Sequence, residues 1–99
     1  MNFVIHGQSS MPSIAGGYLV IKLNNQVFHI TSVPSPFLLG EGYRDSIVEN
    51  DDDLEDDDGN HYLVNVWSSN VGVDWEIKID AADDALKNRV SVEYQPNEF

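Results

Sequence analysis

The chain has 99 residues, of which 41% are hydrophobic and 10% aromatic, which is enough for one hydrophobic core and too short for two. Its formal net charge of −12 at pH 7 opposes direct binding to nucleic acid, whose phosphates carry the same sign. No apolar run approaches the about 20 residues of a membrane span, the first residues do not resemble a secretory signal, and cysteine is absent. We therefore expect a single cytoplasmic domain over residues 1–99 that contacts neither membrane nor nucleic acid.

The charge is distributed very unevenly along the sequence. Residues 1–40 contain no acidic side chain and a single base, Lys22. Residues 41–60 contain ten acids and one base, and residues 61–99 contain seven acids and three bases. Three quarters of the net charge therefore falls in one fifth of the chain, and this segment is the main indication of function.

The first half of the chain predicts three strands. The segments 2–6, 18–23 and 26–32 are rich in β-branched and aromatic residues. Asn24 and Asn25 separate the second and third of these segments. Because asparagine tolerates positive φ, the pair predicts a two-residue primed turn and hence a hairpin.

The middle of the chain predicts irregular structure. Two prolines and two glycines punctuate residues 34–46, so that we expect a loop there. The acidic residues that follow predict a second, acidic loop at about 49–60, because blocks of like charge repel one another and stay extended.

The last third predicts a hairpin of residues 61–67 and 71–79, a short helix over 81–88 capped by Asp80, and a final strand over 89–94. Residues 71–79 alternate with a period of two, which is typical of a half-buried strand. The expected inner face carries Val71, Val73, Trp75, Ile77 and Ile79, and the outer face Asp74, Glu76 and Lys78. The fold class is thus mainly β (all-β or α+β), with five to six antiparallel strands in a small sandwich or twisted sheet and at most one short helix near 81–88.

The sequence contains no motif of an enzyme active site. Phosphate-binding glycine loops, zinc-binding histidine pairs and nucleophile elbows are all absent. His6, His29 and His61 fall in three different predicted strands, without the spacing of metal ligands. Asp74 and Glu76 share a strand face about 6.5–7 Å apart, within the range of glycosidase carboxylates, but such pairs are common on solvated faces. We expect no enzymatic activity, no cofactor and no metal site.

The acidic run is the strongest candidate for a functional site. It has seven acids in eight positions, interrupted only by Leu54. An EF-hand alignment with Gly59 at the invariant glycine would place Leu54 and Asn65 at the first and last ligand positions, which excludes that motif. A solvated loop, a weak cation site and a surface for a basic partner remain open. The last is favoured because unneutralised clustered carboxylates destabilise the compact state.

We therefore expect a non-catalytic acidic protein that binds a basic protein. The first expectation is an immunity or inhibitor protein that neutralises a cationic toxin or nuclease domain by electrostatic blocking of its active site. The alternatives are a phage-encoded nucleic-acid mimic of the anti-restriction or anti-CRISPR type, and a structural or assembly protein. Trp67 is a further aromatic candidate, with core packing as the competing interpretation. The residues predicted to bind the partner are Asp51, Asp52, Asp53, Glu55, Asp56, Asp57, Asp58, Asp74, Glu76, Tyr43 and Tyr62.

Overall fold

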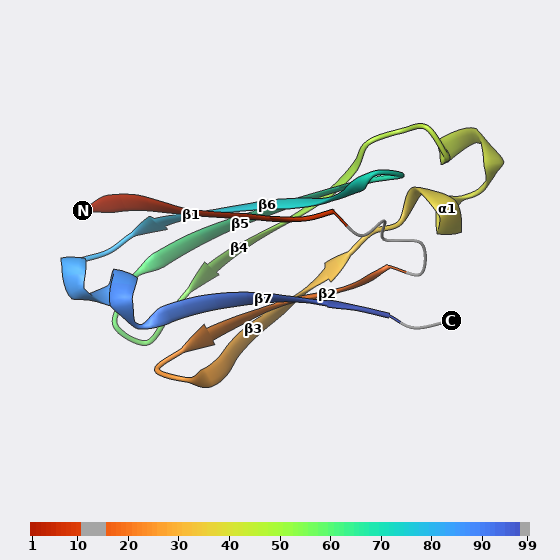
Figure 1. Ribbon diagram of the computed structural model, residues 1–99. Helices are drawn as coiled ribbons and strands as arrows, with labels where there is room; N and C mark the ends of the chain where they lie inside the picture. Colours follow the sequence, from red (N-terminus) through yellow and green to blue (C-terminus); the bar gives the residue numbers. More distant parts are fainter. Residues whose placement is uncertain (11–15, 98–99) are drawn as a thin grey trace.

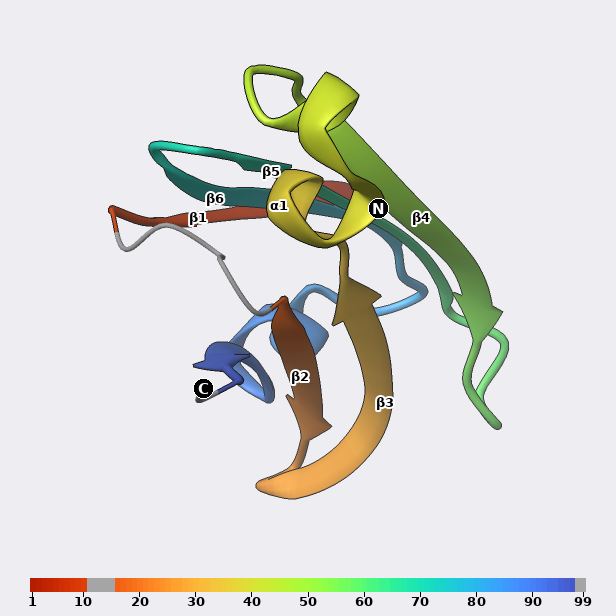
Figure 2. The same ribbon diagram turned by 90° about the vertical axis from the view of Figure 1, so that its right-hand side faces the viewer.

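The protein is a β-sandwich, shown by a computed structural model that describes residues 1–10 and 16–97 (Figure 1). Within these residues, β1, β6, β5 and β4 form a four-stranded antiparallel sheet in that order, and β3, β2 and β7 form a three-stranded one. Figure 2 shows the two sheets face to face, with β3 and β4 along the same side of the sandwich. The strands are β1 (Asn2–Ser9), β2 (Gly17–Leu23), β3 (Gln26–Val33), β4 (Val48–Glu55), β5 (His61–Ser69), β6 (Gly72–Asp80) and β7 (Val90–Pro96). The expected mainly-β class is confirmed.

The core lies between the sheets and is built from alternate residues along the strands, those that face inward. Its fully buried members include Leu19, Ile21, Tyr62, Val64, Val66, Ile77 and Ile79. Trp75 of β6 lies directly over Gly7, its partner residue on β1. A Cβ atom at Gly7 would come within 2.3 Å of the Trp75 indole, so that the core requires glycine at this position.

The hairpins follow the sequence patterns closely. Asn24 and Asn25 adopt φ values of 54° and 65°, which confirms the primed turn between β2 and β3. On β6 the alternation is also confirmed, because Val73, Trp75, Ile77 and Ile79 are all buried. Val71, expected on the same face, is 74% exposed, since β6 begins only at Gly72 and Val71 lies in the preceding turn.

The helical segments differ from the sequence expectation. The expected helix over 81–88 is a single 3₁₀ turn, η2 (Asp84–Asn88), and its cap is Asp83, which accepts the N–H of Ala85 at 2.9 Å. Asp80, the expected cap, ends β6 instead. A short α-helix, α1 (Pro36–Leu39), and a 3₁₀ turn, η1 (Glu41–Tyr43), occupy the segment expected to be a loop. Among the described residues no helix is long and apolar enough to cross a membrane.

The largest correction concerns the acidic segment. It was expected to be a loop at about 49–60, but residues 48–55 form β4, an edge strand paired with β5 over its whole length. Aspartate is depleted in strands, which is why propensity did not predict this one. An edge strand with one solvated face tolerates acids, and outward charges on an edge also discourage pairing with other chains.

Candidate functional site

Strand β4 divides the acidic run between two environments. The residues with even numbers, Val48, Asn50, Asp52 and Leu54, face inward and are half-buried. The residues with odd numbers, Glu49, Asp51, Asp53 and Glu55, are exposed on the outer face. Because successive outward positions lie about 6.6–6.8 Å apart, the four outward carboxylates form a regular row.

Inward-facing Asp52 connects the two sheets where β3 and β4 run side by side. Its Oδ2 accepts hydrogen bonds from Thr31 Oγ1 at 2.7 Å and from His29 Nε2 at 2.9 Å. The ionised carboxylate can only accept, so Nε2 carries the proton. Asn50 adds a third link through its side-chain amide, which donates to the Ser32 carbonyl at 2.9 Å. These side chains link β3 and β4, which belong to different sheets and are not joined by backbone hydrogen bonds.

The environment of Asp52 favours its charged form. Partial burial acts against the charge, but the hydrogen bonds from Thr31 and His29 outweigh it and hold the pKa of Asp52 below its usual value of 3.8. Thr31 is only 1% exposed, so its hydroxyl depends on Asp52 for a partner. Asp52 therefore stabilises the fold, because its carboxylate already accepts hydrogen bonds from Thr31 and His29.

Asp56 organises the turn after β4 in the same way. Its Oδ1 accepts the backbone N–H groups of Asp58 and Asn60, each at 2.9 Å. Its Oδ2 accepts the Asn60 amide at 2.8 Å and the Tyr62 hydroxyl at 2.7 Å. Partial burial opposes the charge, yet these hydrogen bonds hold the pKa of Asp56 below 3.8. Burial and the contact with Asp56 raise the pKa of Tyr62.

The outer face of the four-stranded sheet carries seven of the remaining acids. The pairing register places four cross-strand rows on this face, each running from β1 through β6 and β5 to β4. The rows are Asn2–Asp80–His61–Glu55, Val4–Lys78–Leu63–Asp53, His6–Glu76–Asn65–Asp51 and Gln8–Asp74–Trp67–Glu49. Seven acids and one lysine share this surface, which we call the acidic face.

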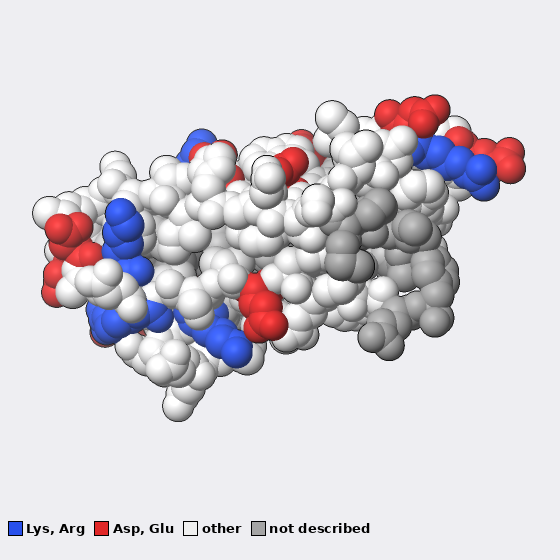
Figure 3. Space-filling view, in the orientation of Figure 1, with Lys and Arg blue, Asp and Glu red and all other residues white. Residues whose placement is uncertain are grey.

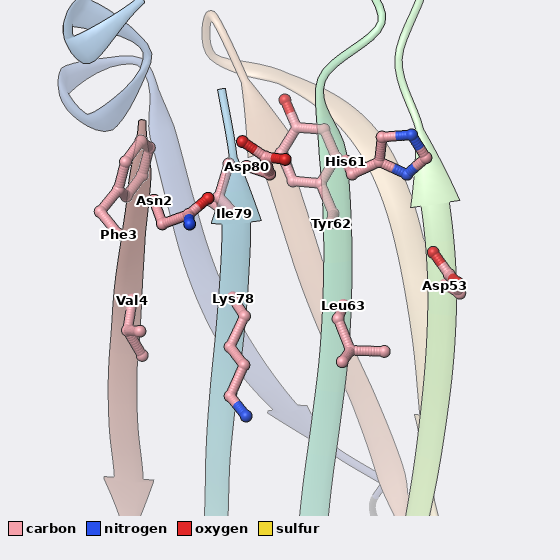
Figure 4. Close-up of a pocket in the computed structure, with 10 residues that line it drawn as sticks. All are labelled: Asn2, Phe3, Val4, Asp53, His61, Tyr62, Leu63, Lys78, Ile79 and Asp80. Atoms are coloured by element: carbon pink, nitrogen blue, oxygen red, sulfur yellow. The ribbon is translucent and has the colours of Figure 1, made fainter. Parts of the chain in front are cut away.

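The acidic face is hollowed toward the end that carries Asn2, Asp80 and His61. A depression of about 310 Å³ is lined by residues of all four strands, among them Val4, Lys78, Leu63, Asp53 and His61 (Figure 4). Leu63 is 38% and Val4 47% exposed, so that apolar contact area lies between the charged side chains. A concave, charged surface that also exposes apolar area has the anatomy of a protein-binding site.

Other parts of the surface are mixed in charge. Figure 3 shows the side along which β1 and β7 run, where acidic and basic side chains are interspersed and both occur at the end that carries η2. The outer face of the three-stranded sheet includes the exposed apolar residues Tyr18, Val27 and Ile30, with Lys22 and Glu93 paired at 3.9 Å. The acidic face therefore carries seven of the 17 acids and about half of the net charge of −12.

The structure brings together five of the residues predicted to bind a partner. They are Asp51, Asp53, Glu55, Asp74 and Glu76, and they all lie on the acidic face. Tyr62, by contrast, is fully buried and does not lie on this face. Asp52 and Asp56 are internal hydrogen-bond acceptors, which argues against a primary role in binding.

The other predicted residues lie off the acidic face. Asp57 and Asp58 are exposed in the turn, and Tyr43 is 50% exposed in η1. The sequence analysis did not select Glu49 and Asp80, which belong to the acidic face. Glu49 could have been found from the sequence, because in a strand it lies on the same face as Asp51, Asp53 and Glu55. The same period of two places Val48 and Leu54 together on the opposite face.

The arrangement of the histidines does not resemble an active site. His29 faces the interior from β3, whereas His61 is on the acidic face across the core, so they cannot act on one substrate group. His29 and Thr31 both bind Asp52 Oδ2 and do not form a nucleophile–histidine relay. In residues 1–10 and 16–97, no cluster of three or more acidic or histidine side chains is suited to hold a metal ion.

Comparison with known proteins gives no further guidance: no family model matches the chain, and neither the curated proteins nor the solved structures contain a significant match.

Proposed function

We propose that the protein is a non-catalytic immunity-type inhibitor, which binds a cationic toxin or nuclease domain through the acidic face and blocks its active site. The observation that carries the proposal is the collection of seven carboxylates and one lysine on a concave sheet face. A nuclease active site is basic because it binds phosphates, so this face complements it in charge. The field of the face would accelerate association by steering the partner.

The row on β4 also supports a second candidate, a nucleic-acid mimic. Its four outward carboxylates are evenly spaced along an extended strand, like the charges of a polynucleotide backbone. A mimic would compete with duplex DNA for a binding groove, whereas an immunity protein would stop cleavage by a catalytic domain. The two functions share the acidic face and differ in the partner.

The test compares two variants that each lose four charges. In the face variant, Glu49→Gln, Asp51→Asn, Asp53→Asn and Glu55→Gln neutralise the β4 row. In the control variant, Glu41→Gln, Asp45→Asn, Asp57→Asn and Asp58→Asn neutralise four exposed acids elsewhere. Both variants and the wild type are immobilised and exposed to the proteins of the source cell. The proposal predicts a basic protein that the wild type and the control retain and the face variant loses.

The retained protein then decides between the two candidates. For the immunity function, stoichiometric addition of wild type should abolish nucleic-acid cleavage by the partner. Its association with the face variant should be slower by about tenfold at low salt, with a smaller difference at high salt. For the mimic, duplex DNA should displace the wild type from a partner without nuclease activity. Equal retention on the two variants would contradict both functions.

A further inference from the structure

The end of the acidic face nearest η1 holds a second, smaller hollow. It has a volume of about 210 Å³ and is lined by Ile47, Trp67, Ser68, Ser69 and Asp74. Ile47 is 73% exposed, although it is a large aliphatic residue. Because Ile47 and Trp67 line the same hollow, it offers apolar contact area and is a candidate contact point.

The sheet register places Trp67 between two carboxylates. Trp67 pairs with Glu49 on β4 and with Asp74 on β6, each directly opposite in the ladder. Opposed side chains in a sheet have Cβ atoms about 4.5–5.5 Å apart, so both carboxylates can reach a group that rests on the indole. In the described part of the chain, neither Glu49 nor Asp74 forms an ion pair.

We propose that this hollow, the Trp67 notch, receives an arginine side chain of the basic partner. An indole face attracts a cation above it, and the planar guanidinium can stack on the ring while its edge donates to carboxylates. Lysine would satisfy the charge without the stacking or the bidentate geometry. Ile47 and the ring would then cover the methylene groups of the arginine. The inference rests on the proposed function and identifies the partner group that anchors it.

The notch has the location expected of an interface anchor. Tryptophan and arginine are enriched among the residues that dominate binding energy, where neighbouring contacts exclude water. Trp67 is half-buried on the outer face, so its ring is already held in place before a partner arrives. The β4 row would steer the partner, and the notch would fix its orientation.

The experiment uses N-acetyl-arginine amide as the probe and follows its binding by NMR on the ¹⁵N-labelled protein. The indole N–H of Trp67 and the amides of residues 67–69 and 74 should shift saturably at millimolar probe. Trp75, in the core at 9% exposure, is the internal reference and should not move. N-acetyl-citrulline amide, a neutral isostere, should bind at least about fivefold more weakly, because it lacks the charge.

Single variants locate the site. Asp74→Asn and Glu49→Gln should each weaken arginine-amide binding by about threefold, while Asp53→Asn, with the same charge change two rows away, should weaken it by less than about twofold. Trp67→Leu should remove the saturable component. The dispersion of the NMR spectrum shows whether the Trp67→Leu variant is folded. If it is unfolded, Asp74→Asn and Glu49→Gln still test the site.

The result that overturns the inference is specific. Equal binding of the arginine and citrulline probes, or an Asp53→Asn effect as large as that of Asp74→Asn, would show that no notch selects a guanidinium. In that case the face variant could still lose the basic partner, and the proposed function would stand without the notch. Conversely, a functioning notch with no retained partner would leave arginine recognition intact and contradict the proposed function.

Discussion

The inward-facing and outward-facing acids of residues 49–58 have the same charge but differ in burial and in hydrogen-bond partners. Asp52 and Asp56 accept hydrogen bonds from buried or half-buried groups, including the hydroxyls of Thr31 and Tyr62. The carboxylates of Asp51 and Asp53, one residue away from Asp52, point into solvent. The contrast shows that acids adjacent in the sequence can have different roles in the structure. In an edge strand, the period of two assigns successive acids alternately to stability and to the surface.

The largest effect should come from Asp56→Ala. The substitution removes four hydrogen bonds and leaves the buried Tyr62 hydroxyl without its partner, so it should lower the free energy of unfolding by about 3 kcal/mol. Urea denaturation measures the change, and Asp57→Ala is the matched control, expected within about 0.5 kcal/mol of wild type. In a Tyr62→Phe background the cost of Asp56→Ala should be smaller; equal costs would contradict the coupling of these side chains.

Asp52→Ala should have the next largest effect, a loss of about 2 kcal/mol in the free energy of unfolding. It removes the hydrogen bonds from Thr31 and His29 that link β3 to β4, two strands that are not joined by backbone pairing. The adjacent substitutions Asp51→Ala and Asp53→Ala should leave stability within about 0.5 kcal/mol of wild type. A loss at Asp51 equal to that at Asp52 would erase the distinction between the two faces of β4.

The contribution of Asp52 should depend on pH in a defined direction. Its pKa in the folded protein is lowered from 3.8, so the stabilisation is complete well above that pH and disappears as pH falls through the folded value. The difference in unfolding free energy between wild type and Asp52→Asn should therefore be constant from about pH 5 to 7 and shrink below about pH 4. Measuring the difference cancels the repulsion common to both proteins. A difference that grows on acidification would contradict the hydrogen-bonded, ionised state.

The face variant should change stability less than Asp56→Ala or Asp52→Ala does, and in the opposite direction. Neutralising Glu49, Asp51, Asp53 and Glu55 removes mutual repulsion. Among the described residues it removes one ion pair, that of Glu55 with His61 at 3.9 Å. Stability should rise by at most about 1 kcal/mol, and the gain should vanish in high salt. A pronounced loss in thermal or urea denaturation would mean that the outer row supports the fold.

The strand positions were predictable where apolar residues recur with a period of two. Val73, Trp75 and Ile77 identify β6 directly, and the two asparagines identify the β2–β3 turn. Strand β4 was not predicted because aspartate has a low propensity for strands. The evidence for a strand was weaker: Val48 and Leu54 are an even number of positions apart and so lie on one strand face. The same spacing places Asp52 on that inward face.

The candidate site was only partly accessible from the sequence. On β5, Tyr62 shares its parity with Val64 and Val66, whereas Trp67 shares it with His61 and Asn65, a pattern that separates a core aromatic from a surface one. Tyr62 therefore belongs to the core by its parity, and Trp67 to the surface. The bonding of Asp56 to Tyr62 and the alignment of Asp74 with Trp67 depend on strand pairing, which no local pattern specifies.

The central claim is that the outward acids, and not acidic charge in general, form the binding surface. The most direct test is NMR titration of the ¹⁵N-labelled protein with a hexa-arginine peptide at physiological salt. We predict that shifts concentrate at Asp51, Asp53, Glu55, Asp74 and Glu76, and that the exposed acids Asp57, Asp58 and Asp84 scarcely respond. Shifts of equal size at all exposed acids, on and off the acidic face, would contradict the account.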